Sequence, residues 1–387
     1  MIYKKLEKYI KKKYKKKNIF LHEPIIDRSD FSSIKKTLKD KQLSTHGNVS
    51  DIFSKKIKKI CNVRFCIPLN SATSALHLSL ISNDIRPKDE VIVPSLGFIA
   101  SANAILYSNA SPIFLDVEED TLGIDPIKLE VFILNKTKIT NKGLINKKTK
   151  KKIKALIAFH PFGSSCKILD IQKICKKYKI KLIEDAAEAF GSYYNKKHLG
   201  TFGDCGVISF NGNKIITTGA GGVLITNSSK IAKIALSKSK ICKINHPYKF
   251  IADDLGYNNR MASINASLGL GQLKKLNKIL KKKKIIHNQY KDFINKNYSD
   301  SFKILSEPIN CQSNFWLNIL KLKKKNKKII DKIIKYLISK NIHVRPLWEP
   351  LHTLKYLKKF QTENLNVTNK LSSQIVLLPS GIDGYVK

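Results

Sequence analysis

Arginine is scarce in this chain of 387 residues, although cationic side chains dominate it. Only five of its 72 lysines and arginines are arginine, against 29 aspartates and glutamates, so the formal net charge is +43. A nucleic-acid binder would be expected to use arginine for bidentate contacts to phosphates and bases. The lysines are also spread over the whole length, together with abundant isoleucine and asparagine, as in proteins of A/T-rich genomes. We therefore expect no nucleic-acid partner, while an anionic small-molecule substrate remains compatible with the charge.

Paired cysteines and long apolar runs are also missing. The seven cysteines are odd in number and form no C-x-x-C pair, which predicts reduced thiols in a cytoplasmic protein and no metal site. No run of eighteen apolar residues predicts a membrane span. The lysine-rich N-terminus lacks the apolar core of a secretory signal. Its Ile2, Leu6 and Ile10 would share one face of a short helix, for which a membrane-surface role is the less favoured alternative.

The apolar pattern divides the chain into two parts. Between about residues 60 and 240, short apolar runs alternate with helical patterns, which predicts an α/β layer with a mostly parallel sheet. The expected strands are 90–94, 112–116, 155–160, 181–184, 206–210 and 223–226, and the expected helices are 73–82, 99–108, 168–178 and 229–238. Residues 135–154 are interpreted as a solvated insertion.

After about residue 245 the pattern changes. One or two long lysine-faced helices over 264–295, strands at 302–305, 315–321 and 342–345, and a helix over 327–340 predict a smaller α+β domain. We therefore expect a large domain over residues 1–245, including an N-terminal arm, and a small domain over residues 246–387.

Two motifs suggest a ligand site. In I-E-D-A-A-E (183–188), Asp185 follows a buried strand, and ligands bind at the carboxyl ends of parallel strands; capping of the next helix is the alternative. In L-N-S-A-T-S-A-L-H-L (69–78), small hydroxyl residues precede a helical run, whose first N–H groups can bind an anion. Simple capping would explain this motif as well.

Lys214 lies between a strand end and a glycine-rich turn in S-F-N-G-N-K-I-I-T-T-G-A-G-G (209–222). The glycines allow close backbone approach and leave room for a flat ligand; a hairpin with a solvated lysine is the alternative. The sequence contains no P-loop. An anion nest, a carboxylate at a strand end and a lysine together suit pyridoxal 5'-phosphate (PLP), which needs a partner for its phosphate, its ring nitrogen and its aldehyde.

The order of these motifs resembles that of a known family. N-S-A-T-S-A-L, E-D-A-A-E-A-F-G-S, F-G-D-C-G-V-I-S-F, N-G-N-K-I-I-T-T-G-A-G-G and L-G-Y-N-N-R-M follow one another as in the PLP-dependent nucleotide-sugar aminotransferases of the DegT/DnrJ/StrS type. The resemblance covers about residues 22–379. It implies an α/β fold of PLP fold-type I (aspartate aminotransferase-like): a large domain with a mostly parallel sheet plus a smaller α+β C-terminal domain.

The resemblance also implies roles for individual residues. Lys214 would form the Schiff base with the cofactor and carry protons during catalysis, Asp185 would pair with the ring nitrogen, and Phe98 would stack on the ring. The other implied cofactor contacts are Ala72, Thr73 and Ser209 at the phosphate, Glu188 near the ring hydroxyl, and Asn258 at the phosphate of the neighbouring subunit's cofactor, in a homodimer. Weaker candidates, for substrate contacts, are Arg345, His160 and His352. Trp316 is interpreted as a core residue.

Two positions depart from the family pattern, since Glu188 stands where many relatives carry Gln or His, and Gly97 where Thr is frequent. One branch of this family aminates UDP-linked 4-keto-6-deoxy-N-acetylhexosamines, as in legionaminic acid pathways. The chain looks closest to this branch in three short motifs, L-H-E-P (21–24), G-S-Y-Y (191–194) and R-P-L-W (345–348). The implied reaction is transamination with glutamate as the amino donor. The alternatives are C3 transamination, dehydration, or an inactive cationic binding protein.

Overall fold

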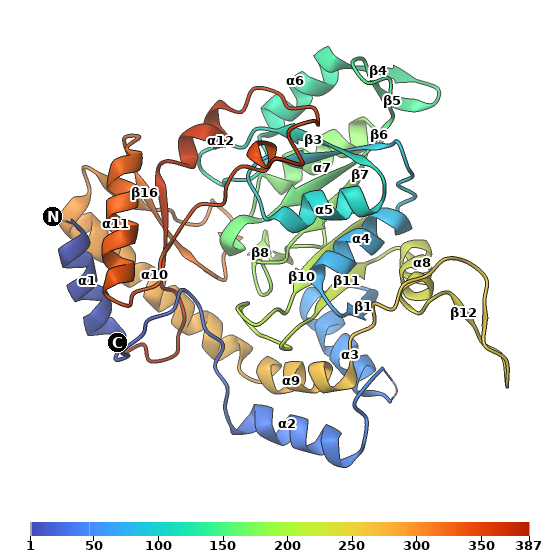
Figure 1. The fold of residues 1–387 in the computed structure, drawn as a ribbon, viewed down its shortest axis with the longest axis horizontal. Helices are drawn as coiled ribbons and strands as arrows, with labels where there is room; N and C mark the ends of the chain where they lie inside the picture. Colours follow the sequence, from blue (N-terminus) through green and yellow to red (C-terminus); the bar gives the residue numbers. More distant parts are fainter. Residues whose placement is uncertain (1, 46, 387) are drawn as a thin grey trace.

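The computed structural model describes residues 2–45 and 47–386 (Figure 1). Its largest sheet has seven strands in the order β1-β11-β10-β7-β6-β2-β3. These are β1 (Phe65–Leu69), β2 (Glu90–Pro94), β3 (Ser111–Leu115), β6 (Ile153–Phe159), β7 (Lys181–Asp185), β10 (Cys205–Ser209) and β11 (Gly222–Thr226). Strands β10, β7, β6, β2 and β3 run parallel, whereas β11 is antiparallel to both β10 and β1. The predicted mostly parallel sheet is confirmed.

Helices cover both faces of this sheet. Strands β2, β10 and β11 are buried along their whole length, as expected where both faces are covered. One hydrophobic cluster contains residues of α4 (Ala72–Ser82), α5 (Ile99–Tyr107) and α8 (Ser229–Ser239). A second contains residues of α3 (Val49–Cys61), α6 (Pro126–Lys136) and α7 (Ile168–Lys177). Since β-strand side chains alternate between faces, each strand contributes to both clusters.

A smaller layer follows in the C-terminal part. It has a four-stranded antiparallel sheet in the order β14-β16-β18-β17, formed by β14 (Phe302–Ile304), β16 (Asn318–Leu322), β17 (Arg345–Pro346) and β18 (Ile375–Leu378). Its helices are α10 (Leu276–Tyr298), α11 (Lys327–Ser339) and α12 (Asn366–Leu371), while α9 (Ser263–Leu273) packs on α2 (Arg28–Lys39) and α3. The smaller α+β part is thus confirmed. The predicted strand start at residue 315 is wrong, because Phe315 has a left-handed φ of 47° and lies in the turn before β16.

The N-terminal helix α1 (Ile2–Lys13) packs against α11 of the small layer (Figure 1). Its Ile2, Leu6 and Ile10 are buried, and the rings of Tyr3 and Tyr336 lie 4.6 Å apart. The apolar face that suggested a membrane-surface helix is therefore covered by the protein itself. By its contacts, the N-terminal arm lies with the C-terminal layer.

The remaining strands form small hairpins. The expected insertion contains the hairpin of β4 (Thr137–Thr140) and β5 (Gly143–Asn146), and a second hairpin joins β12 (Lys243–Ile244) to β13 (Ile251–Ala252). Strands β8 (Tyr193–Tyr194), β9 (Lys197–His198) and β15 (Cys311–Gln312) form a three-stranded sheet, and short 3-10 turns occur at Pro161–Gly163 and Leu351–Thr353.

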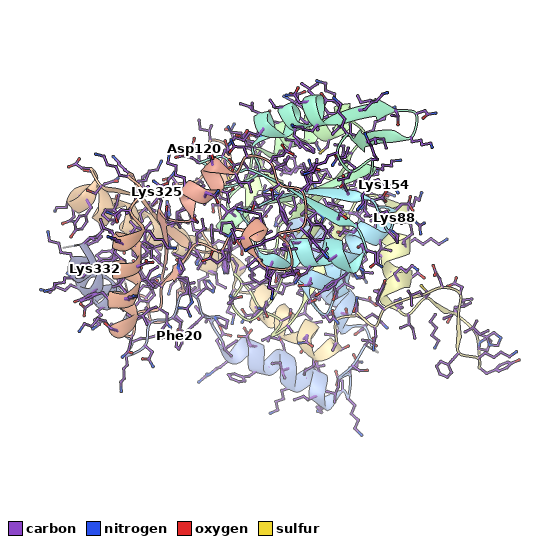
Figure 2. All side chains as sticks on the ribbon, turned by 45° about the horizontal axis from the view of Figure 1, so that its top comes forward. Phe20, Lys88, Asp120, Lys154, Lys325 and Lys332 are labelled. Carbon is purple, nitrogen blue, oxygen red and sulfur yellow. The ribbon has the colours of Figure 1, made fainter. Side chains whose placement is uncertain are left out.

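Lysine side chains are spread over both layers, as the labelled lysines of Figure 2 illustrate. Within the described residues, no helix combines the length and the apolar character needed to cross a membrane.

Candidate active site

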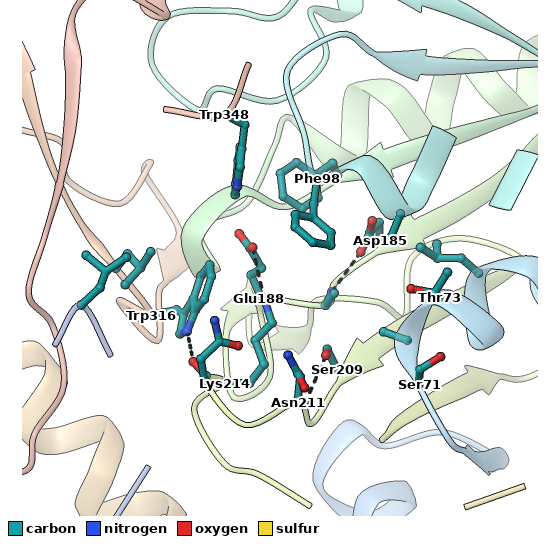
Figure 3. A pocket seen from close by; sticks show the side chains of 18 of the residues that line it. Ser71, Thr73, Phe98, Asp185, Glu188, Ser209, Asn211, Lys214, Trp316 and Trp348 are labelled. Atoms are coloured by element: carbon teal, nitrogen blue, oxygen red, sulfur yellow. Dashed lines mark hydrogen bonds and ion pairs between the residues drawn. The ribbon is translucent and has the colours of Figure 1, made fainter. Parts of the chain in front are cut away.

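A cavity of about 690 Å³ opens where the large sheet meets the small layer (Figure 3). Strand β7 ends at Asp185 and β10 ends at Ser209, and both residues line the cavity. Parallel sheets bind ligands at the carboxyl ends of their strands, so the cavity lies where the motifs predicted a site. Lys214, Glu188, Phe98, Ala72, Thr73 and Arg345 line it as well.

Lys214 follows β10 in a tight turn, in which its N–H donates to the carbonyl of Asn211 at 3.0 Å. Its Nζ lies 3.2 Å from Oε1 of Glu188 and 3.7 Å from the centroid of the Trp316 ring. The side chain is 14% exposed. The structure thus excludes the alternative of a solvated lysine in a hairpin, because the amine points into the cavity between a carboxylate and an indole face (Figure 3).

Glu188 is held from both sides. Its Oε2 accepts a hydrogen bond of 2.8 Å from the backbone N–H of Phe162, which leaves Oε1 facing Lys214. Phe162 is buried and has a left-handed φ of 54°, a conformation that is costly for a bulky residue and requires support from its surroundings. Burial raises the pKa of Glu188, and the nearby Lys214 opposes this shift.

Asp185 is buried at the end of β7. Its carboxylate accepts hydrogen bonds from Ser101 Oγ at 2.5 Å and from the N–H of Ala187 at 3.2 Å. Burial raises the pKa of Asp185, whereas the hydrogen bond from Ser101 lowers it. Ser101 is not among the residues predicted from the sequence, although it stands one helical turn after Phe98 and therefore on the same side of α5.

The start of α4 forms the far wall of the cavity. Ser71 is its N-cap, and Ser71 Oγ accepts from the N–H of Ser74 at 3.0 Å. Among the described residues, the N–H groups of Ala72 and Thr73 donate to no acceptor. At Gly222, an added Cβ would lie 2.5 Å from the N of Ala72. The glycine at the start of β11 is therefore what allows the sheet to approach this helix end, which is suited to binding an anion.

Four of the described aromatic residues line the cavity: Phe98, Phe159, Trp316 and Trp348. Phe98 is 50% exposed and faces the space between Asp185 and Lys214 (Figure 3). Trp348 stacks on Phe162 with a centroid distance of 4.5 Å and an interplanar angle of 6°, and Trp316 donates from its indole N–H to the carbonyl of Asn213 at 2.7 Å. Trp316 is mostly buried, as its interpretation as a core residue predicted, but its ring also contacts Lys214. Trp348 belongs to the R-P-L-W motif, but no role was assigned to it from the sequence, because a single aromatic residue after a short strand does not show which way its ring points.

Of the three residues predicted to contact the substrate, one lies at the cavity and two do not. Arg345 lines the cavity, on β17. His160 does not reach it, because its ring is completely buried between Glu184, at 3.0 Å, and Cys166. Although burial favours the neutral ring, these two neighbours raise the pKa of His160 to about 10. His352 also lies outside the lining and is bound to Ser95 Oγ at 2.7 Å.

Asn258 does not line the cavity of its own chain. It lies exposed beside the β12–β13 hairpin, where it pairs with Lys240 in an isolated bridge. This position agrees with a role toward a neighbouring subunit, which stays a prediction.

The cavity contains a suitable binding group for each part of PLP. Free N–H groups at the start of α4 and the Ser209 hydroxyl suit its phosphate, the buried carboxylate of Asp185 suits its ring nitrogen, and the Lys214 amine suits its aldehyde. Phe98 offers an aromatic face between these groups. The residues present therefore fit this cofactor.

Comparison with known proteins agrees with this site. Residues 24–383 match the family model described as the DegT/DnrJ/EryC1/StrS aminotransferase family. The chain is 32% identical to the GDP-perosamine synthase of Escherichia coli O157:H7 over 347 residues, which cover 89% of each protein. It is 35% identical to the UDP-4-amino-4,6-dideoxy-N-acetyl-beta-L-altrosamine transaminase of Campylobacter jejuni over 281 residues, 72% of this chain and 70% of that protein. Among solved structures, Helicobacter pylori PseC, an aminotransferase involved in pseudoaminic acid biosynthesis, superposes with a TM-score of 0.84 at 27% identity and covers 94% of each chain.

Proposed function

Because this chain belongs to the DegT/DnrJ/EryC1/StrS aminotransferase family, we propose that it aminates C4 of a UDP-linked 4-keto-6-deoxy-N-acetylhexosamine, with glutamate as the donor. It is a PLP-dependent aminotransferase of nucleotide-linked sugars. The observation that carries the proposal is the convergence of Lys214, Asp185 and the start of α4 on one cavity. These groups come from three separate motifs, and no core-packing requirement brings them together.

Each cofactor contact has a residue in the cavity. Asp185 would hold the ring nitrogen, Ala72, Thr73 and Ser209 would hold the phosphate, and Phe98 would cover the ring. When bound, PLP supplies an electron sink that stabilises negative charge on the carbon next to the transferred nitrogen. Because Ser101 and Ala187 both donate to Asp185, the carboxylate is fixed in direction before any ligand enters.

Lys214 would move the proton in both halves of the reaction. Its Nζ is held by Glu188 Oε1 and by the face of Trp316, so the amine is restricted to a small region of the cavity. A positioned acid or base contributes typically 10²–10⁴-fold to a rate. Glu188 would serve to orient this amine, since Phe162 fixes the other oxygen of its carboxylate.

The identity of the sugar and of its nucleotide is the most specific part of the proposal. Relatives named for a UDP-linked altrosamine support the uracil nucleotide and position 4, whereas relatives named for GDP-perosamine cover more of the chain and favour guanine. Arg345 at the cavity wall provides a cation for the diphosphate. We propose a role in surface-glycan synthesis, with legionaminic acid as the predicted product family. C3 transamination and dehydration are the alternatives on the same scaffold.

We further propose a homodimer as the functional unit. The β12–β13 hairpin extends away from the body (Figure 1) and carries Tyr248 and Phe250, which are 79 and 92% exposed; Leu255, just after β13, is 73% exposed. A second copy would cover these side chains and would bring Asn258 toward the other cavity. A cytoplasmic location is proposed because all seven cysteines, which lie in the described residues, are free thiols.

The first prediction concerns the substrate. Purified protein loaded with PLP is incubated with nitrogen-labelled glutamate and, in turn, with UDP-, GDP- and dTDP-linked 4-keto-6-deoxy sugars. We expect the labelled amine at C4 of the UDP-N-acetylhexosamine, detected by mass spectrometry and located by NMR. Amination of the GDP sugar alone would refute the proposed substrate and leave the enzyme class intact. No amine with any sugar, despite bound PLP, would refute the aminotransferase activity.

A further inference from the structure

Helix α6 (Pro126–Lys136) is apolar on two opposite sides. One side faces the core and buries Leu129, Phe132 and Ile133. The other side carries Ile127, Val131 and Leu134, which are 71, 50 and 60% exposed. Their spacing of four and three residues places them on one face. An apolar face of a helix is normally packed against another element, but residues 2–45 and 47–386 leave this outer face open.

The apolar face continues onto the neighbouring hairpin. Strand β4 contacts α6, and its Ile139 is 68% exposed. We name the four side chains Ile127, Val131, Leu134 and Ile139 the α6 ridge. In Figure 1, α6 and the β4–β5 hairpin project at the top of the molecule, away from α2 and from the β12–β13 hairpin. A second copy bound at the β12–β13 hairpin would therefore not cover the ridge.

The segment that carries the ridge has about twice the average lysine density of the chain. Residues 126–152 contain nine lysines and one acid, Glu130. Glu130 is paired with Lys177 at 2.7 Å. The formal net charge of residues 126–152 is +8, and Asp170 and Glu363 of neighbouring segments reduce it locally. Lys136, Lys138 and Lys142 are exposed and lie close to the ridge residues in the sequence. The general lysine enrichment of the chain accounts for part of this charge, but not for its coincidence with an exposed aliphatic face.

We propose that the α6 ridge docks the enzyme onto the surface of an anionic lipid bilayer. Aliphatic side chains on a projecting edge can enter the boundary between headgroups and acyl chains, while adjacent lysines attract anionic headgroups. A single-stranded nucleic acid would also use exposed aromatic side chains for base stacking, and the one aromatic residue in 126–152, Phe132, is buried. None of the ridge residues lines the catalytic cavity, so docking leaves the substrate path open.

The second prediction tests this docking with the PLP-loaded full chain. Vesicles of phosphatidylcholine with phosphatidylglycerol, and vesicles of phosphatidylcholine alone, are sedimented with the protein at low and high salt. We expect binding to the anionic vesicles, with weakening as salt screens the lysines. The triple variant I127S/V131S/L134S should reduce binding about tenfold or more, because it removes the inserted side chains. The variant K138E/K142E should reduce it by about fivefold or more per lysine.

A matched control uses another lysine-rich helix. On α11, Ile329 and Ile338 are 39 and 42% exposed, and I329S/I338S should bind vesicles as the wild type does. All variants should retain transamination, since they change surface residues outside the cavity. The docking proposal is overturned if the wild type ignores anionic vesicles, if neutral vesicles bind equally, or if the triple variant binds unchanged. It is also overturned if the wild type forms a larger oligomer that the triple variant abolishes, or if it binds an acidic polypeptide in preference to vesicles.

Discussion

Lys214 and Lys283 are both withdrawn from solvent, and both contact Trp316 from different sides. Lys214 lies over the Trp316 ring beside the carboxylate of Glu188. Lys283, on α10, is completely buried and donates to the carbonyls of Trp316 and Ser380 at 2.7 and 2.5 Å. Burial lowers the pKa of Lys283 well below the ordinary lysine value. Lys283 therefore holds the cavity wall in place, whereas the amine of Lys214 is open to a ligand in the cavity.

The difference lies in access and in partners. Lys214 lines a cavity of about 690 Å³, whereas Lys283 does not line it. A buried amine whose acceptors are backbone carbonyls works as a cross-link, since it satisfies groups that would otherwise be buried without a donor. Burial by itself therefore does not identify a catalytic lysine; an open side with room for a ligand does.

The third prediction, with the largest expected effect, removes the accessible lysine. Lys214→Ala should lower turnover more than about 10³-fold, because the positioned acid and base is lost. Its free energy of unfolding should stay within about 1 kcal/mol of wild type. Turnover is measured with the aminated sugar as product, and stability by urea unfolding. Lys281→Ala, an exposed change on α10, is the control; a K214A variant with near-normal turnover would contradict the catalytic role.

The fourth prediction concerns the removal of Lys283, the completely buried lysine. Lys283→Met should lower the free energy of unfolding by about 2–6 kcal/mol, because two buried carbonyls lose their donor at about 1–3 kcal/mol each. Urea unfolding measures this change, and Lys281→Met provides the exposed control on the same helix. If K283M is as stable as wild type, Lys283 does not act as a cross-link, and the contrast drawn between Lys214 and Lys283 is wrong.

The fifth prediction concerns pH and has the smallest effect. The folded pKa of Lys283 is lowered, so between that value and the unfolded value of roughly 10.4 the unfolded chain binds more protons. Wild-type stability should therefore rise with pH relative to K283M, by at most about 1.4 kcal/mol per pH unit. Unfolding curves of both proteins at several alkaline pH values give this difference. An equal pH dependence would show that the Lys283 amine titrates alike in both states.

Much of the fold was predictable because it rests on local patterns. All six strands predicted for the large sheet are present, with ends displaced by at most two residues. Strand β1 was missed, since its F-C-I-P-L contains a proline and lies at the antiparallel edge. Phe315 misled the prediction because its apolar character suggested a strand, whereas its backbone is in a turn.

The site was predictable where one short motif carries its chemistry. Lys214, Asp185, Ser209 and the start of α4 reach one cavity as expected. His160 shows the limit, because its motif at the end of a buried strand resembles a site residue, but Glu184 and Cys166 enclose its ring. Which way such a side chain points depends on partners elsewhere in the fold.

By itself, the sequence determined the alternation of strands and helices, the family motifs and the choice of Lys214 as the proposed reactive lysine, since these depend on neighbouring residues in the chain. Tertiary structure alone decided that Trp316 faces Lys214, that Ser101 orients Asp185, that Lys283 fastens the cavity wall, and that α1 is covered while the α6 ridge is not. These contacts join residues far apart in sequence, and packing selects them through burial and hydrogen-bond satisfaction. No local pattern records them.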